Sequence, residues 1–269
     1  MVQRKGPMVV LVSGAQMSAS YLIPLQRKLE ELDVASVTFD KLGTGKSDPT
    51  DEMNFELYAQ QIHELLQIIE NKEIILVGHS FGGVAIQFYT QLYKADPRIK
   101  SIVLVEPTPT DLIVKENPKG FDSYYKKTDK VHNFLVCTLA NLGLIRLVAD
   151  LFIVPFKLFT RFTFEETNRF LGDFSDAVLI NKLSVETNSI TDMFYEGRAL
   201  ENWTSPVKTI MVVGGSGQDG IVGTLMAKFY DQTSQRLNAE LLVEPAKNHY
   251  TIVFSKLLKR AILKEYFCE

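Results

Sequence analysis

Short apolar runs alternate along the chain with segments whose apolar residues recur every three to four positions. We predict that six runs are strands, at 8–12, 34–39, 73–77, 101–105, 208–213 and 239–243. Amphipathic stretches predicted to be helices separate the first four, at 18–32, 54–70 and 82–95. Strands that are apolar throughout and alternate with helices indicate an α/β fold, with a mostly parallel sheet covered by helices on both faces.

The first two predicted helices each carry an apolar stripe. These stripes consist of Tyr21, Leu25, Leu29 and Leu32 in the first, and of Tyr58, Ile62, Leu65 and Ile69 in the second. Side chains at this spacing lie on one face of a helix, so we expect both stripes to face the sheet.

The alternation stops between about Thr108 and Trp203, where only helical patterning rich in Leu, Phe and Ile is found. Because the strands that follow need the first sheet to pair with, we predict an all-helical cap at 108–203 inserted into a core of 1–107 and 204–269. Thr163-Phe164-Glu165-Glu166 has the pattern of a capping box. The cap's phenylalanines could line an apolar pocket or pack as its own core: Phe134, Phe152, Phe156, Phe159 and Phe162.

One serine is surrounded by glycines at the end of a predicted strand. The sequence Gly78-His79-Ser80-Phe81-Gly82 follows the strand at 73–77 and leads directly into a helix. A nucleophilic serine needs an exposed oxygen, a base within reach and backbone N–H groups directed at the developing oxyanion. A sharp turn from strand to helix supplies the exposed oxygen and the N–H groups, and it crowds the backbone so that glycine is favoured beside the serine.

In this motif and its context the chain resembles the α/β-hydrolase family, and the resemblance extends over nearly the whole length. Val12-Ser13-Gly14-Ala15 follows the first predicted strand, where the family usually has His-Gly and then an oxyanion-hole residue. The resemblance assigns the hole to the N–H groups of Ala15 and Phe81. The segment 40–48, DKLGTGKSD, is similar to the family's Asp-x-x-Gly-x-Gly-x-Ser-Asp turn.

The resemblance also implies the other members of a catalytic triad. Among the four histidines, His249 follows the last predicted strand, where the family carries its catalytic histidine. Asp219 follows the strand at 208–213, as the family's usual acid does, and is the predicted triad acid. Glu106, at the end of the strand at 101–105, occupies the position that some members use for the acid, so it stays an alternative. The implied activity is that of a serine hydrolase acting on an ester or related acyl bond.

Composition narrows the choice of partners. The net charge of −3 and the sequence pI of about 5.9 give no electrostatic reason to expect nucleic acid. Cys137 and Cys268 have no CxxC spacing, which favours neither a disulfide framework nor a zinc site. We expect no cofactor or metal, and a small-molecule substrate. The N-terminal apolar run is interpreted as a strand, and the apolar stretch at 133–162 is interrupted by charges and a proline, so we expect a cytoplasmic protein without a stable membrane span.

Two other functions stay open from the sequence. Residues 215–220, GSGQDG, match G-x-G-x-x-G after a strand, with Glu240 about 20 residues beyond, as in a dinucleotide-binding fingerprint. Only one predicted strand follows, however, whereas such fingerprints normally open a longer βαβ unit. The same fold can also serve as a small-molecule receptor that lacks catalysis.

Overall fold

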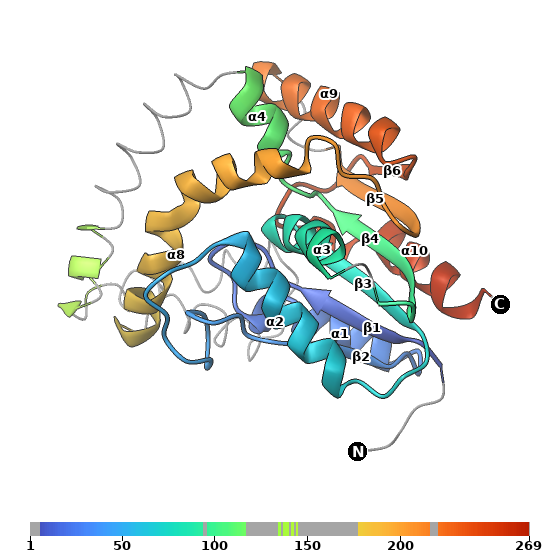
Figure 1. The fold of residues 1–269 in the computed structure, drawn as a ribbon, viewed down its shortest axis with the longest axis horizontal. Coiled ribbons are helices and arrows are strands. Elements are labelled where there is room, and N and C mark those ends of the chain that lie inside the picture. Colours follow the sequence, from blue (N-terminus) through green and yellow to red (C-terminus); the bar gives the residue numbers. More distant parts are fainter. Residues whose placement is uncertain are drawn as a thin grey trace.

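Six parallel strands form one sheet, in the order β2-β1-β3-β4-β5-β6 (Figure 1). The structure is a computed structural model that describes residues 6–93, 96–116, 134–135, 137–139, 141–142, 144, 177–215 and 220–268. Within these residues the strands are β1 (Met8–Val12), β2 (Ser36–Thr38), β3 (Ile74–His79), β4 (Ile99–Val105), β5 (Lys208–Gly214) and β6 (Glu240–Glu244). Each overlaps a predicted strand, and the predicted α/β class is confirmed.

The central strands are apolar throughout because helices cover both faces of the sheet. Every residue of β3 is buried, and its side chains alternate between two hydrophobic clusters. Ile74 and Leu76 belong to one cluster, whereas Ile75 and Val77 belong to the other. Edge strand β6 is only partly buried.

The helices divide between these two clusters. The first cluster contains side chains of α2 (Phe55–Ile68), α3 (Phe81–Leu92) and α9 (Gly220–Arg236). The second contains side chains of the short helix η1 (Ala19–Tyr21), of α1 (Ile23–Glu30), of η3 (Ile252–Phe254) and of α10 (Lys256–Phe267). The sheet therefore has a helical layer on each face (Figure 1).

The helix predicted at 18–32 is wrong in its bounds. The structure divides this stretch into η1 and the shorter α1, with Pro24 in the first turn of α1. Proline fits a first turn because its missing N–H would have no partner there. Leu32 lies beyond the end of α1 and is 41% exposed, so it does not extend the buried stripe. The helix predicted at 54–70 is confirmed as α2, which buries Tyr58 and Ile62 as expected.

The described part of 108–203 is helical. It comprises α4 (Thr110–Glu116), α8 (Ala177–Glu196) and η2 (Gly197–Leu200). Figure 1 shows α8 beside the carboxyl ends of the strands, toward which the arrowheads of β1 and β4 point. The capping box at 163–166 and four of the five phenylalanines lie outside the described residues, and Phe134 is 70% exposed. The cap boundaries stay a prediction.

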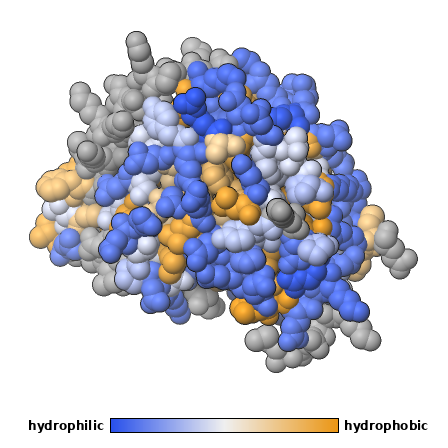
Figure 2. Space-filling model, viewed as in Figure 1, coloured by the Kyte–Doolittle hydropathy of each residue, from blue (hydrophilic) through white to orange (hydrophobic). Residues whose placement is uncertain are grey.

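Hydrophilic residues cover most of the face seen in Figure 2, and hydrophobic residues show between them in smaller patches. This distribution agrees with apolar side chains turned inward onto the sheet. Among the helices of the described residues, none has the length and apolar character needed to cross a bilayer.

Candidate active site

Ser80 stands alone between β3 and α3, at the sharp turn that the sequence predicts. Its backbone angles are φ 55° and ψ −122°, which places a residue with a Cβ atom in a region that side chains disfavour. The Ser80 N–H donates to the carbonyl of Val105 on β4, at 3.0 Å, and the Ser80 carbonyl accepts from the N–H of Gly83, also at 3.0 Å. The strained turn is thus fixed from both sides, and strain held in this way is typical of functional positions.

The glycines around Ser80 are required by close backbone contacts. A Cβ atom on Gly78 would lie 2.6 Å from the carbonyl oxygen of Gly82, and one on Gly82 would lie 2.4 Å from the carbonyl oxygen of Val12. A Cβ atom on Gly14 would lie 2.9 Å from the Cβ of Ser80. The loop after β1 therefore packs directly against the serine, which explains the glycines on both segments.

The buried carboxylate of Glu106 pairs with the partly exposed imidazole of His249. The Oε2 atom of Glu106 lies 2.7 Å from Nδ1 of His249, and the Glu106 side chain is only 6% exposed. The other carboxylate oxygen accepts from the N–H of Gly214 at the end of β5. A Cβ atom on Gly214 would approach this oxygen to 2.7 Å, so glycine makes room for the carboxylate.

His79 holds the backbone of the His249 loop. Its Nε2 lies 2.9 Å from the His249 carbonyl oxygen and donates to it, while Tyr21 donates its hydroxyl to the carbonyl of Tyr250 at 2.6 Å. Burial, together with the nearby His249, lowers the pKa of His79 well below its ordinary value of 6.5. A neutral His79 therefore positions the loop that carries His249.

The Ser80 hydroxyl has one side-chain partner in the described part of the chain. Ser80 Oγ lies 3.1 Å from the hydroxyl of Thr108, two residues after Glu106. Within the described part of the chain, neither Nε2 of His249 nor the backbone N–H groups of Ala15 and Phe81 have a hydrogen-bond partner. These groups are available to a substrate.

The predicted site residues are thus only partly brought together. Ser80 contacts Thr108, and Glu106, the alternative acid, contacts His249. Asp219, the acid predicted first, lies outside the described residues, as do the central positions of the 215–220 fingerprint. Sequence reasoning missed Thr108 and the role of His79, because neither stands in a motif of its own. No group of three His, Cys, Asp or Glu that could hold a metal occurs in the described ranges.

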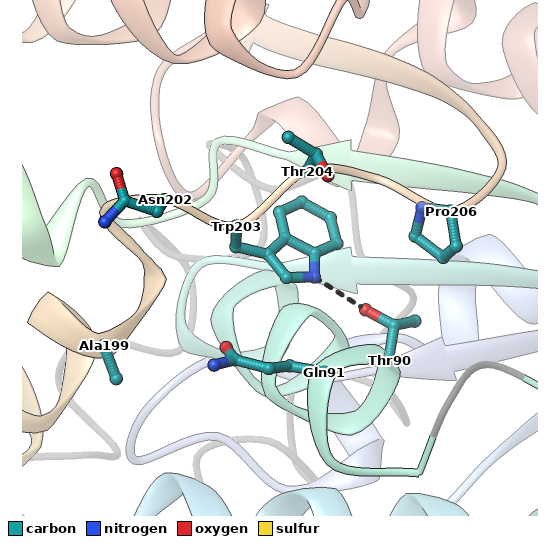
Figure 3. Close-up of a pocket in the computed structure, with 7 residues that line it drawn as sticks. All are labelled: Thr90, Gln91, Ala199, Asn202, Trp203, Thr204 and Pro206. Carbon is teal, nitrogen blue, oxygen red and sulfur yellow. Dashed lines mark hydrogen bonds between the residues drawn. The ribbon is translucent and has the colours of Figure 1, made fainter.

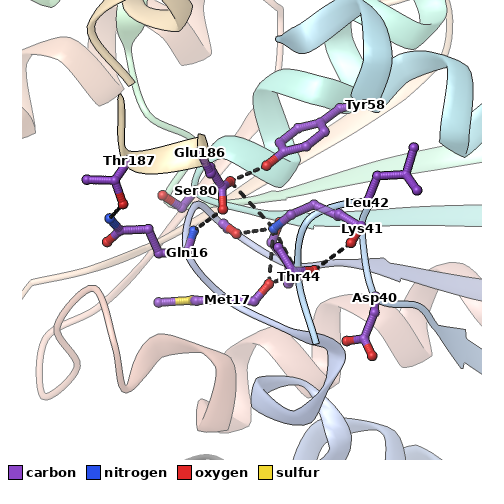
Figure 4. A network of polar contacts seen from close by, with 12 residues as sticks. Gln16, Met17, Asp40, Lys41, Leu42, Thr44, Tyr58, Ser80, Glu186 and Thr187 are labelled. Carbon is purple, nitrogen blue, oxygen red and sulfur yellow. Dashed lines mark hydrogen bonds and ion pairs between the residues drawn. The ribbon is translucent and has the colours of Figure 1, made fainter. Parts of the chain in front are cut away.

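A second polar network, also missed from the sequence, lies beneath the loop 13–17 that follows β1 (Figure 4). Lys41 is 1% exposed, and its ammonium group donates to the carbonyls of Gly14 and of Met17, the latter at 3.1 Å. Glu186 of α8 is fully buried and lies 4.0 Å from the Lys41 ammonium group. Its carboxylate accepts from the hydroxyl of Tyr58 and, at 2.7 Å, from the N–H of Gln16.

A cavity of about 320 Å³ lies elsewhere, between the end of α3 and the segment that leads into β5. In it the Trp203 indole donates to the hydroxyl of Thr90 at 3.1 Å (Figure 3). Thr90 lies ten residues along α3 from Ser80, or about 15 Å at the rise of an α-helix. This cavity is therefore separate from the serine.

A comparison with protein-family models places residues 7–136 in the alpha/beta hydrolase fold family. This stretch includes β1, the serine turn and Glu106, and it ends within the predicted cap.

Curated proteins named as esterases also match part of this chain. The chain is 29% identical over 120 residues to the esterase YbfF of Escherichia coli, a match of 44% of this chain and 46% of that protein. It is 27% identical over 147 residues to protein phosphatase methylesterase 1 of Candida albicans, a match of 50% of this chain and 41% of that protein. The chain spans less than half the length of the curated relatives it matches.

Solved structures extend the likeness to the whole fold. An esterase from Exiguobacterium antarcticum superposes with a TM-score of 0.67 at 15% identity, over 97% of this chain and 92% of that one. At this identity the likeness concerns the fold.

Proposed function

Because the chain belongs to the α/β-hydrolase fold family, we propose that it is a serine hydrolase that cleaves an ester or related acyl bond of a small molecule. Ser80 is the nucleophile, His249 the general base and Glu106 the acid of the triad. Two observations carry this proposal: the strained serine at a strand-to-helix turn, and a histidine whose Nδ1 is bonded to a buried carboxylate and whose ring lies 4.8 Å from that of His79, the residue before the serine.

The reaction follows from the positions of these groups. The Ser80 hydroxyl turns from Thr108 to Nε2 of His249, which takes its proton as Oγ bonds to the acyl carbon. The imidazolium keeps its Nδ1–H directed at Glu106, and it then protonates the leaving group as the bond from the acyl carbon to that group breaks. Water, activated by the same imidazole, hydrolyses the acyl-enzyme.

The N–H groups of Ala15 and Phe81 form the proposed oxyanion hole. Phe81 is the first residue of α3, so its N–H points out of the helix N-terminus, where the helix dipole favours negative charge. Ala15 stands on the loop that packs against Ser80 through Gly14. Two such donors stabilise the tetrahedral intermediate more than the ground-state carbonyl.

We propose Glu106 as the acid because its carboxylate lies 2.7 Å from Nδ1 of His249 and can only accept, so the single N–H of the neutral imidazole is on Nδ1. A second carboxylate at the same atom would compete for that proton. Asp219 stays the alternative that the chain order Ser, Asp, His suggests.

We further propose that the helical cap at 108–203 covers the serine and that the acyl group is apolar. The support for this step is the abundance of Leu, Phe and Ile in the cap sequence. Aryl esters of medium-length acyl chains are therefore the substrates chosen for assays.

Covalent labelling with a fluorophosphonate probe tests the proposal. The folded protein should form one adduct, located on Ser80 by mass spectrometry, and Ser80→Ala should abolish both the adduct and the esterase activity. Thr50→Ala serves as the control, because Thr50 is none of the residues assigned to the site and its hydroxyl bonds to the backbone of Glu52.

The same experiment separates the remaining alternatives. A folded protein without an adduct would favour the receptor, whereas saturable NAD binding that depends on Gly215 would favour the dinucleotide-binding protein. An adduct on another residue would overturn the proposed mechanism.

A further inference from the structure

Two buried charges, Lys41 and Glu186, hold two successive peptide groups of the loop 13–17. Lys41 lies beneath the loop, and its ammonium group donates to the carbonyl of Gly14. Glu186 comes from α8 of the predicted cap and accepts from the N–H of Gln16. The peptide group between Gly14 and Ala15 and the one between Ala15 and Gln16 are thus each fixed by a charged side chain.

The direction of the Ala15 N–H follows from these contacts. No cis peptide bond occurs among the described residues, and in a trans peptide the C=O and N–H bonds point in opposite directions. Since the Gly14 carbonyl points down to Lys41, the Ala15 N–H of the same peptide group points away from Lys41. A Cβ atom on Gly14 would lie 2.9 Å from the Cβ of Ser80, so the residue that precedes this N–H borders the serine.

A hydrogen bond from an ammonium group also polarises the peptide that accepts it. Hydrogen bonds in a chain strengthen one another, and the effect is larger in a low-dielectric interior. Lys41 is 1% exposed and its charge is not screened by solvent there. The Ala15 N–H is therefore a stronger donor than that of an ordinary peptide group.

Helix α8 contacts the loop 13–17 through hydrogen bonds to Gln16. This residue has a positive φ of 56°, a conformation that a residue with a side chain adopts at a cost. Glu186 binds its N–H at 2.7 Å, and the neighbouring Thr187 accepts from its side-chain amide at 2.6 Å. Tyr58 donates to the other oxygen of Glu186 and fixes the carboxylate in turn.

We propose that Lys41 and Glu186 are positioning residues of the oxyanion hole, through which the docking of α8 sets the direction of the Ala15 N–H. This inference rests on the proposed function. Neither residue touches the reacting atoms in this scheme. Burial lowers the pKa of Lys41 while the charges of Glu186 and Asp40 raise it, so the paired carboxylate helps to keep the buried amine protonated.

Three variants test the proposal without relying on one fold-sensitive change. Glu186→Gln keeps the size of the side chain and removes its charge, and Thr187→Val removes the bond to the Gln16 side chain. Glu186→Gln alone leaves the buried Lys41 charge without its partner, which is destabilising, so Lys41→Met with Glu186→Gln removes both charges together as a second test. Glu265→Gln is the matched control, since Glu265 is buried and paired with Lys208 at the amino end of β5, whereas the loop 13–17 follows the carboxyl end of β1.

The readouts distinguish positioning from a merely structural role. We measure kcat per active site titrated with the fluorophosphonate, KM, and the affinity of a boronic acid that mimics the tetrahedral intermediate. Glu186→Gln and the double variant should lose about 10- to 100-fold in kcat, with KM changed by no more than about twofold and boronic acid affinity reduced in parallel. Thr187→Val should show a smaller loss of the same kind, and Glu265→Gln should keep its kcat.

The two possible failures are distinguishable. Wild-type protein that does not react at Ser80 would overturn the proposed function. Wild-type protein that reacts, beside folded Glu186→Gln and double variants whose kcat per active site and boronic acid affinity equal those of the wild type, would overturn only the positioning role.

Discussion

At the scale of single residues, our assignment of the triad acid rests on the contacts of Glu106. This side chain is buried, adopts a positive φ of 42°, and uses one oxygen for Gly214 and the other for His249. An acid in this position keeps Nδ1 of the histidine protonated, so that Nε2 can accept the serine proton. We predict that Glu106→Gln lowers kcat about 10³- to 10⁴-fold, measured by steady-state kinetics on an aryl ester, while the variant keeps the wild-type fold.

The matched variant is Asp219→Asn, which should change kcat little. Melting temperatures of both variants are compared with that of the wild type, so that lost activity is not confused with lost folding. A nearly inactive Asp219→Asn enzyme beside an active Glu106→Gln enzyme would return the role to Asp219.

The residues that the sequence could identify are those marked by a local pattern. Ser80 stands within a short glycine motif, and His249 follows the last strand, so both could be found without knowledge of spatial contacts. The choice between Glu106 and Asp219 depends on which carboxylate reaches Nδ1 across the sheet, and no local pattern encodes that distance. Lys41 and Glu186 are 145 positions apart, and their pairing becomes visible only when α8 lies against the loop after β1.

At the scale of elements, α8 ends against the start of α2. The Glu196 carboxylate, at the last residue of α8, accepts from the N–H groups of Phe55 at 2.8 Å and Glu56 at 3.1 Å. Asn54 supplies the usual side-chain cap by accepting from Leu57. The free N–H groups at the start of α2 are thus shared between its own N-cap and a distant helix, which joins the cap sequence to the core.

We predict that Glu196→Ala lowers the free energy of unfolding by about 1–2 kcal/mol, because two helix N–H groups lose their acceptor. Glu196→Gln should cost less, since the amide oxygen still accepts and, as burial raises the pKa of Glu196, the charged form is already disfavoured. Urea unfolding measures both. Glu64→Ala, at an exposed position of α2, is the control. An equal loss of unfolding free energy in Glu64→Ala would contradict the anchoring role of Glu196.

Element positions were more predictable than their ends. All six strands were expected within a few residues because continuous apolar runs mark strands buried on both faces. The bounds of α1 were wrong because the apolar spacing of Tyr21 and Leu25 continues across a break at Leu22, where a short 3₁₀ turn gives way to the helix. Periodicity alone does not register such a change of helix type.

At the scale of the whole molecule, stability is linked to pH through a histidine at the centre of the fold. His79 is 1% exposed at the end of β3, its ring lies 4.8 Å from that of His249 and 5.3 Å from that of Tyr21, and its Nδ1 has no partner among the described residues. Burial is the main cause that lowers its pKa in the folded protein, followed by the charge of His249. In the unfolded chain the same imidazole regains its ordinary pKa near 6.5.

The sign of the pH effect follows from this difference. Below about pH 6.5 the unfolded chain binds a proton that folded His79 does not, so its contribution to stability is complete above that pH and is lost as the pH falls toward the folded pKa. One proton taken up on unfolding corresponds to about 1.4 kcal/mol per pH unit. We therefore predict that the wild-type free energy of unfolding, from urea titrations at pH 7.5, 6.5 and 5.5, falls on acidification more steeply than that of His79→Gln. The glutamine amide can still donate to the His249 carbonyl but does not titrate, so parallel slopes in the two proteins would show that His79 is not the linked group.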